Sequence, residues 1–326
     1  MTTVGTAEGG AIRDGSLALL FPGQGAQTPG MGAELVAAGA GAPLLAAAVA
    51  EGVDLATLVT SADAEMLRRT DRAQPALFYV GWSLAEALRA GGLRPAAVAG
   101  HSLGEWVAVA VAGALDPVEA FRLVCLRGAL MAGAPPGGMA AVLGGTMEVV
   151  TAACEAATTA GTPCVVANDN APGQVVISGT AAGVAAVQVA LRAVGIRKVV
   201  PLNVGGAFHS PLMAAAAATF AARLAAVRVG DARIPVALNA TGRCARAGGE
   251  VRQGLADQLA QPVRWTEVVR ALRVAGVETF VECGPGTTLT GLVRRIAPEA
   301  RCRSVATLAA AADLAAELAG PPDAPA

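Results

Sequence analysis

The sequence has few of the residues that usually hold metals or form disulfides. Its 326 residues include only two histidines, and its six cysteines lie far apart with no Cys-x-x-Cys pair. These ligands cannot be assembled into a metal site of recognisable spacing, so we expect neither a metal nor a bound cofactor. We expect the cysteines to be structural thiols, because free cysteine is usually buried.

An excess of charge of one sign is also missing. The chain carries 24 basic and 25 acidic side chains, a formal net charge of −1. A balanced charge gives no electrostatic reason to bind nucleic acid or an anionic membrane. We therefore expect neither of them as a partner.

Long apolar runs and a secretion signal are absent as well. Hydrophobic residues make up 54% of the chain, but its uncharged stretches are rich in Ala and Gly and are interrupted by polar residues or proline. Residues 128–147, for example, contain Pro135-Pro136 followed by two glycines, whereas a membrane helix needs roughly 20 apolar residues. The first fifteen residues have neither a basic nor an apolar segment. We expect a soluble, cytoplasmic protein.

Short apolar runs do alternate with helical segments. The run at 17–21 ends in Pro-Gly, which is typical of a buried strand that enters a turn. Strands are expected at 17–21, 96–99, 234–238 and 278–282, and helices at 31–50, at 73–90 with Pro75 near its first turn, and after residue 100 through Ala112. This alternation predicts an α/β fold with a parallel sheet covered on both faces.

Residues 137–206 follow a different order. Strands are expected near 139–143, 163–168, 174–178 and 198–202, with helices at 147–158 and 181–194. The order βαββαβ is that of a ferredoxin-like unit. We predict a small subdomain at 137–206, inserted into a large catalytic domain formed by 15–136 and 207–305. Residues 306–326 are expected to form a C-terminal helix and a frayed tail.

The strongest chemical signal is Gly-His-Ser-Leu-Gly at 100–104, between a predicted strand and a predicted helix. In this setting GxSxG is a nucleophile elbow, in which a strained turn exposes the hydroxyl at the end of the strand. The helix N-terminus there favours developing negative charge. Ser102 is the candidate nucleophile. The alternative is a Gly-rich turn whose serine caps a helix.

A serine nucleophile needs a base, and the chain has two imidazoles to offer. His101 precedes Ser102, and successive side chains at the end of a strand point in different directions. His209, in Gly-Ala-Phe-His-Ser, is left by elimination. The alternative is that His209 has a purely structural role.

Two further segments could bind an acyl substrate. Arg127 lies in the predicted helical segment LRGALM, and its planar guanidinium matches a carboxylate; the alternative is a solvated surface arginine. The segment FPGQGAQ at 21–27 follows a predicted strand. Its glycines allow close backbone approach, and an N–H there could complete an oxyanion hole with the Leu103 N–H. The alternative is an ordinary tight turn.

Seven motifs in one order resemble a known family. The sequence is similar to the malonyl-CoA:acyl carrier protein transacylases and to the acyltransferase domains of polyketide synthases. The resemblance extends from about residue 17 to 300 and rests on FPGQGAQ, GHSLGE, RGALM, NDNAPGQVVISG, GAFHS, QLAQPVRW and ECGPG. Seven motifs in register are far more specific than any one of them.

The resemblance assigns expected roles to individual residues. Ser102 corresponds to the acylated serine, His209 to its partner and Arg127 to the group that holds a malonyl carboxylate. Gln24 and Leu103 correspond to the backbone donors of the oxyanion hole. Residues expected at or near the substrate pocket are His101, Met131, Asn168, Phe208 and Gln258. The resemblance also implies a hydrolase-like α/β body with a ferredoxin-like insertion, in agreement with the segmentation above.

The activity that the resemblance implies is acyl transfer through a Ser-His dyad. A malonyl unit would pass from coenzyme A, as substrate, to the phosphopantetheine thiol of an acyl carrier protein. A bulky Phe208 would fill the space of a 2-methyl group and favour malonyl. We expect a stand-alone, trans-acting monomer for polyketide or fatty acid biosynthesis. Alternatives are a carrier-protein thioester hydrolase, a transferase for 2-substituted malonyl units, or a scaffold with a decayed site.

Overall fold

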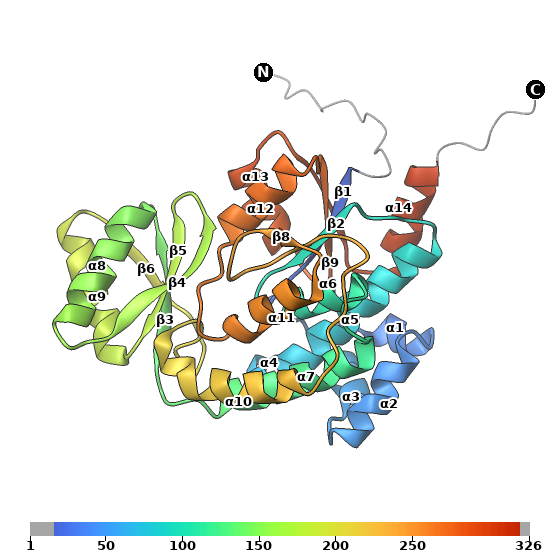
Figure 1. The fold of residues 1–326 in the computed structure, drawn as a ribbon, viewed down its shortest axis with the longest axis horizontal. Coiled ribbons are helices and arrows are strands. Elements are labelled where there is room, and N and C mark those ends of the chain that lie inside the picture. The colour runs from blue at the N-terminus through green and yellow to red at the C-terminus, as the bar shows by residue number, and fades with distance from the viewer. Residues whose placement is uncertain (1–15, 320–326) are drawn as a thin grey trace, which may run out of the picture.

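The structure, a computed structural model, describes residues 16–319 and contains two β-sheets (Figure 1). The helix predicted within 306–326 is present as α14 (Leu308–Ala319), whereas the predicted tail, PPDAPA at 321–326, lies outside the described residues. Within residues 16–319, no helix is both long and apolar enough to span a membrane. All six cysteines are free thiols, and three of them, Cys154, Cys164 and Cys283, are fully buried.

The larger sheet has six strands in the order β10-β9-β1-β2-β7-β8, and all of its pairs except β7–β8 are parallel. Its strands are β1 (Leu17–Phe21), β2 (Ala97–Gly100), β7 (Val236–Ala237), β8 (Cys244–Ala245), β9 (Thr279–Cys283) and β10 (Arg301–Val305). The predicted parallel sheet is confirmed. The sequence did not indicate β10, because this edge strand is largely exposed and lacks an apolar run.

Helices cover both faces of this sheet, as predicted. Alternate residues of β1 point to opposite sides: Leu19 packs into a core with α5, α6 and α7, whereas Leu20 packs against α12 and α13. These helices are α5 (Thr70–Ala90), α6 (Gly104–Val111), α7 (Pro117–Ala132), α12 (Trp265–Val274) and α13 (Thr288–Ile296). The others around this sheet are α1 (Ala33–Ala37), α2 (Ala42–Ala50), α3 (Leu55–Thr60), α4 (Ala64–Arg68), α10 (Ala214–Ala225), α11 (Gly248–Asp257) and α14 (Leu308–Ala319).

Two predicted helices differ in detail from those observed. The helix expected at 31–50 is divided into α1 and α2, because Gly39 and Gly41 adopt left-handed backbone angles, with φ of 70° and 67°. The helix expected at 73–90 begins at Thr70, so Pro75 lies inside α5 rather than near its first turn. A proline there removes one backbone hydrogen bond, which this buried helix tolerates.

The smaller sheet is antiparallel, with the order β4-β5-β3-β6. Its elements are β3 (Gly138–Leu143), α8 (Met147–Thr159), β4 (Cys164–Ala171), β5 (Gln174–Gly179), α9 (Ala181–Ala193) and β6 (Lys198–Pro201). This is the predicted βαββαβ order, and it forms the green and yellow lobe in Figure 1. The helices α8 and α9 cover one face of the sheet. The exact boundaries predicted for the subdomain stay predictions.

Candidate active site

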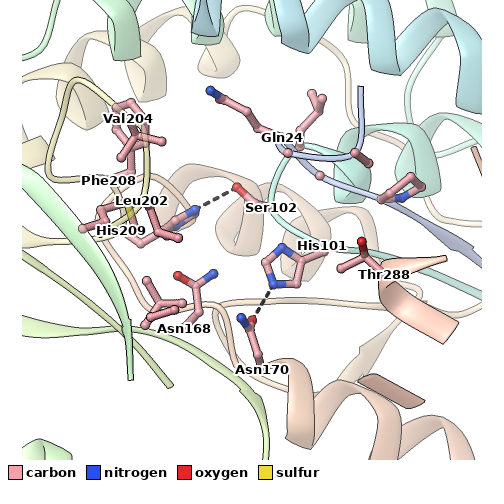
Figure 2. Close-up of a pocket in the computed structure, with 18 of the residues that line it drawn as sticks. Gln24, His101, Ser102, Asn168, Asn170, Leu202, Val204, Phe208, His209 and Thr288 are labelled. Carbon is pink, nitrogen blue, oxygen red and sulfur yellow. Dashed lines mark hydrogen bonds between the residues drawn. The ribbon is translucent and has the colours of Figure 1, made fainter. Parts of the chain in front are cut away.

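A cavity of about 300 Å³ lies at the carboxyl ends of β1 and β2. The loops that follow these strands form one side of the cavity, and the helix-free face of the smaller sheet forms another (Figure 2). Residues 202–209, which lead from β6 towards α10, complete its wall. Ligands of open α/β sheets bind at the carboxyl ends of the strands, so this cavity is the candidate active site.

Ser102 occupies the turn between β2 and α6 with φ of 50°, in the left-handed region. The glycines on either side permit close packing: a Cβ atom on Gly104 would lie 1.9 Å from the Phe21 carbonyl oxygen. Asn239, which the sequence analysis did not indicate, stabilises the turn through two hydrogen bonds. Its Oδ1 accepts a hydrogen bond from the Ser102 N–H at 2.7 Å, and its Nδ2 donates to the Gly100 carbonyl at 2.8 Å. The turn has the geometry of a nucleophile elbow.

His209 meets Ser102 across the cavity, with its Nε2 2.7 Å from Ser102 Oγ (Figure 2). Its other ring nitrogen, Nδ1, lies 2.9 Å from the Gln258 carbonyl oxygen and 3.2 Å from that of Gln261. A carbonyl only accepts, so Nδ1 carries the proton and Nε2 is free to accept one from the serine hydroxyl. Backbone carbonyls, not a carboxylate, therefore orient this ring.

The surroundings keep His209 neutral. Burial and, after it, the positive charge of Arg127 lower the pKa of His209 to about 3. An imidazole that is already protonated could not accept a proton from Ser102. Lowering the pKa thus keeps the ring in its proton-accepting form throughout the neutral range.

His101 lines the cavity, but its ring points away from Ser102 (Figure 2). Its Nε2 lies 2.8 Å from Asn170 Oδ1, and its ring centroid is 5.4 Å from that of Trp265. Burial lowers the pKa of His101. Its position agrees with the expectation that His101 cannot serve Ser102.

Arg127 of α7 is almost fully buried, so the surface alternative for this residue is wrong. Its Nη2 donates to Ser102 Oγ at 2.9 Å, its Nη1 to Gln74 Oε1 at 2.7 Å and its Nε to Gln258 Oε1 at 3.2 Å. Burial lowers the pKa of Arg127 to about 10, which leaves it charged at neutral pH. No carboxylate in residues 16–319 forms an ion pair with it. A substrate carboxylate can therefore act as its partner.

The two expected oxyanion donors flank Ser102. Gln24 follows β1, Leu103 precedes the first turn of α6, and both line the cavity. Within the described part of the chain, neither backbone N–H has a hydrogen-bond acceptor. The Gln24 side chain turns aside and donates to Thr70 Oγ1 at 3.2 Å. Two free N–H groups beside a nucleophile can hold a negatively charged oxygen.

The structure brings nine of the ten expected residues to the cavity wall. Met131, Asn168 and Phe208 line it with those already described. Gln258 does not: it is buried behind Ser102, and its Nε2 donates to the Ser102 carbonyl at 2.8 Å. The expectation that Gln258 belongs to the substrate pocket is corrected, because buried hydrogen bonds hold its amide away from the cavity.

Sequence reasoning missed several polar residues that hold this site. They come from separate parts of the chain and are Gln74, Glu105, Asn170 and Asn239. Glu105 and Asn170 belong to the motifs GHSLGE and NDNAPGQVVISG, which was the one signal that could have found them. Gln74 and Asn239 stand in no recognised motif.

Comparison with known proteins gives a consistent result. Residues 18–315 match the family model of the acyl transferase domain. The malonyl CoA-acyl carrier protein transacylase of Bacillus subtilis is 39% identical over 285 residues, which are 86% of this chain and 90% of that protein.

Comparison with solved structures agrees with the sequence comparison. The crystal structure of a malonyl-CoA:acyl carrier protein transacylase from Xanthomonas oryzae superimposes with a TM-score of 0.87 at 40% identity, covering 93% of this chain and 98% of that one. A malonyl-transacylase in complex with its type II polyketide synthase acyl-carrier protein has a TM-score of 0.85 at 35% identity, with coverage of 91% and 97%. The chain therefore belongs to the acyl transferase domain family.

Proposed function

We propose that this protein transfers a malonyl unit from coenzyme A to the phosphopantetheine thiol of an acyl carrier protein through a malonyl-serine intermediate. One observation carries the proposal: Ser102 Oγ lies 2.7 Å from His209 Nε2 and 2.9 Å from Arg127 Nη2. The serine hydroxyl thus lies within hydrogen-bond distance of both a neutral base and a cation that has no ion-pair partner among the described residues. The names of the relatives, which are malonyl transacylases, support the choice of acyl group.

In the first half of the reaction, His209 Nε2 accepts the proton of the Ser102 hydroxyl while Oγ attacks the thioester carbon. The N–H groups of Gln24 and Leu103 hold the oxyanion of the tetrahedral intermediate, and such a donor contributes about 10²–10³ in rate. The C–S bond then breaks, and the thiolate of coenzyme A leaves with the proton from His209. The enzyme is left as malonyl-Ser102.

In the second half, the carrier protein supplies the thiol. His209 accepts the thiol proton, and the thiolate attacks the ester carbon of malonyl-Ser102. The C–O bond to Oγ breaks, and Ser102 takes back the proton from His209. The sequence is a ping-pong reaction, because the first product leaves before the second substrate reacts.

Arg127 and Phe208 select the acyl group. Arg127 moves from Ser102 Oγ to the free carboxylate of the malonyl unit and pairs with it through its planar fork. Phe208 lines the cavity beside His209 (Figure 2), and a bulky ring there leaves less room for a 2-methyl substituent. We propose that its ring favours malonyl over methylmalonyl.

The carrier protein has a suitable surface at β6. Val200 and Leu202 are 44% and 37% exposed, and Leu202 also lines the cavity. Val200 pairs directly opposite Ala141, another lining residue, so both side chains lie on the cavity face of the sheet. Residues 190–206 contain three basic residues, among them Lys198, and no acidic ones. This surface suits an acidic partner whose thiol-bearing arm enters past Leu202.

The proposal includes a monomeric, cytoplasmic enzyme that serves carrier proteins in trans for polyketide or fatty acid biosynthesis. Ser102, His209 and Arg127 meet within one chain, so the chemistry needs no residue from a second copy. Light scattering coupled to gel filtration tests the monomer, and reconstitution with carrier proteins of each pathway tests the context.

Labelled malonyl-CoA tests the chemistry. Wild-type protein should acquire one covalent label per chain, Ser102→Ala none, and Ser61→Ala, at an exposed position, the wild-type amount. Full labelling of Ser102→Ala would exclude Ser102 as nucleophile. Adding a carrier protein to the labelled enzyme should then give malonyl-carrier protein, whereas predominant release of free malonate would indicate a hydrolase.

A further inference from the structure

Glu105 is a buried carboxyl group that the proposed reaction does not use. It lies in the first turn of α6, three residues after Ser102, and is 0% exposed. It does not line the cavity. Its Oε2 accepts a hydrogen bond from Gln258 Nε2, whereas its Oε1 has no hydrogen-bond partner among the described residues. Burial raises the pKa of Glu105 to about 8, although the Gln258 amide, the backbone N–H of Asn239 and the charge of Arg127 all lower it. A buried carboxyl group costs stability, and its side-chain hydrogen bond to Gln258 indicates a role at the site.

That bond completes the shell around the Gln258 amide. Gln258 Nε2 donates to Glu105 Oε2 and, at 2.8 Å, to the Ser102 carbonyl. Gln258 Oε1 accepts from Arg127 Nε at 3.2 Å and from Trp106 Nε1 at 3.0 Å. Guanidinium and indole nitrogens only donate, so the amide oxygen must face them and the amide nitrogen must face Glu105. The amide is fixed in one orientation with its hydrogen-bonding capacity filled.

Gln258 connects the cation and the base of the site. Its side chain bonds Arg127 Nε, and its backbone carbonyl accepts from His209 Nδ1 at 2.9 Å. Glu105 is the side-chain acceptor on the opposite end of the amide from Arg127. If that acceptor is lost, one buried amide N–H has no partner and three bonds instead of four hold the amide, so the bond that aims the guanidinium at Ser102 Oγ weakens. The effect should be larger on Arg127 than on His209, because the histidine depends on the backbone of Gln258 and not on its side chain.

We propose that Glu105 is a positioning residue for the carboxylate of the acyl group: by holding the Gln258 amide, it keeps the Arg127 guanidinium at Ser102 and favours malonyl over acyl groups without a carboxylate. This inference rests on the proposed role of Arg127. Its physical basis is a hydrogen bond, so an uncharged side chain with an oxygen in the same place should replace Glu105.

Four variants test the proposal by measuring kcat and KM for malonyl-CoA and acetyl-CoA. Glu105→Gln keeps an acceptor oxygen and should stay within about threefold of wild type. Glu105→Leu removes the acceptor and should lower the malonyl-to-acetyl ratio of kcat/KM by about tenfold, as expected for one lost buried hydrogen bond. Glu105→Asp keeps a carboxyl group but is one methylene too short to reach Gln258 Nε2, and should lower the ratio in the same direction. Glu148→Gln, at the exposed first turn of α8, should change nothing.

A double-mutant cycle with Arg127→Ala separates positioning from a merely structural role. In the Arg127→Ala background, Glu105→Leu should not change the malonyl-to-acetyl ratio further, because no guanidinium remains to be aimed. Equal loss of both substrates in a folded Glu105→Leu protein, or a wild-type ratio in Glu105→Asp, would overturn the proposal. If Glu105→Leu does not fold, the Asp and Gln variants decide. Failure of the wild-type enzyme to form malonyl-carrier protein would instead refute the proposed function.

Discussion

Ser102 and His209 meet from two left-handed backbone positions, with φ of 50° and 55° and 2.7 Å between Oγ and Nε2. Among the described residues, they are the two non-glycine residues with positive φ. Such a conformation costs about 1–3 kcal/mol at each residue and persists only where the surroundings enforce it. Asn239 holds the first backbone turn, and the carbonyl of Gln258 holds the ring of the second residue. The strain coincides with the two groups that would exchange a proton.

Arg127 should decide whether the acyl group needs a carboxylate. Replacing it with alanine removes the cation that would pair with malonyl, so we expect kcat/KM for malonyl-CoA to fall by about 10²-fold or more. Transfer of acetyl, which has no carboxylate, should be spared or improved. Steady-state kinetics with both thioesters measure the two effects. An equal loss for malonyl and acetyl would show that Arg127 is only structural.

Phe208 should set the size limit of the pocket. Phe208→Ala opens space beside His209, so activity with methylmalonyl-CoA should rise relative to malonyl-CoA. One methyl group in an apolar pocket is worth about 10–200-fold in discrimination, and the ratio should shift by no more than that. Competition between the two thioesters, with the products resolved by mass spectrometry, gives the ratio directly. Phe280→Leu, which changes a buried ring of β9 that does not line the cavity, is the matched control. An unchanged ratio in Phe208→Ala would exclude steric selection by this ring.

The nucleophile and the base could be predicted from the sequence, because the nucleophile lies in a short local motif and the chain has few histidines that could act as the base. Ser102 stands in a five-residue motif between a strand and a helix, and a chain with two imidazoles leaves little choice for its base. The ferredoxin-like unit was predictable for a similar reason, since each of its elements carries its own apolar period.

The supporting shell could not be predicted in the same way. Gln74, Asn239 and Gln258 act through single buried hydrogen bonds between segments that are far apart in the sequence. A lone amide on a helix or in a loop has no periodicity and no spacing to signal its partner. Gln258 was found through the family resemblance, but its orientation away from the cavity depends on Trp106 and Glu105, which only the fold brings to it.

The lowered pKa of His209 should make stability depend on pH. An unfolded histidine titrates near 6.5, whereas burial and the Arg127 charge lower the folded pKa of His209 to about 3. Between these values the unfolded chain binds more protons, so this contribution to stability is present above pH 6.5 and is lost as the pH falls. Burial also lowers the pKa of His101, so His101 likewise contributes stability that is lost as the pH falls. Burial raises the pKa of Glu105 to about 8, so Glu105 contributes stability that is lost as the pH rises.

Comparison with a variant isolates the His209 contribution. His209→Gln lacks the titrating ring but keeps the contributions of His101 and Glu105. The free energy of unfolding of the wild type should therefore fall relative to that of His209→Gln as the pH is lowered from 7 to 4. Urea unfolding at several pH values in this range measures it. A difference that stays constant would mean that the histidine titrates alike in the folded and unfolded chains.

Lys198 should contribute to carrier-protein binding without taking part in the chemistry. It is exposed at the start of β6, forms no ion pair within the described residues, and pairs opposite Leu143 on the cavity face of the small sheet. Lys198→Glu should raise KM for an acidic carrier protein several-fold, more at low salt than at high salt, because surface charges act mainly on association and are screened. The rate of Ser102 acylation by malonyl-CoA should not change, since that step precedes carrier binding. The control is Arg94→Glu, at an exposed residue that precedes β2 and lies at the amino ends of the large sheet's parallel strands, opposite the cavity. It should leave both steps at wild-type values. If Lys198→Glu behaves like Arg94→Glu, the carrier protein approaches the cavity from another side.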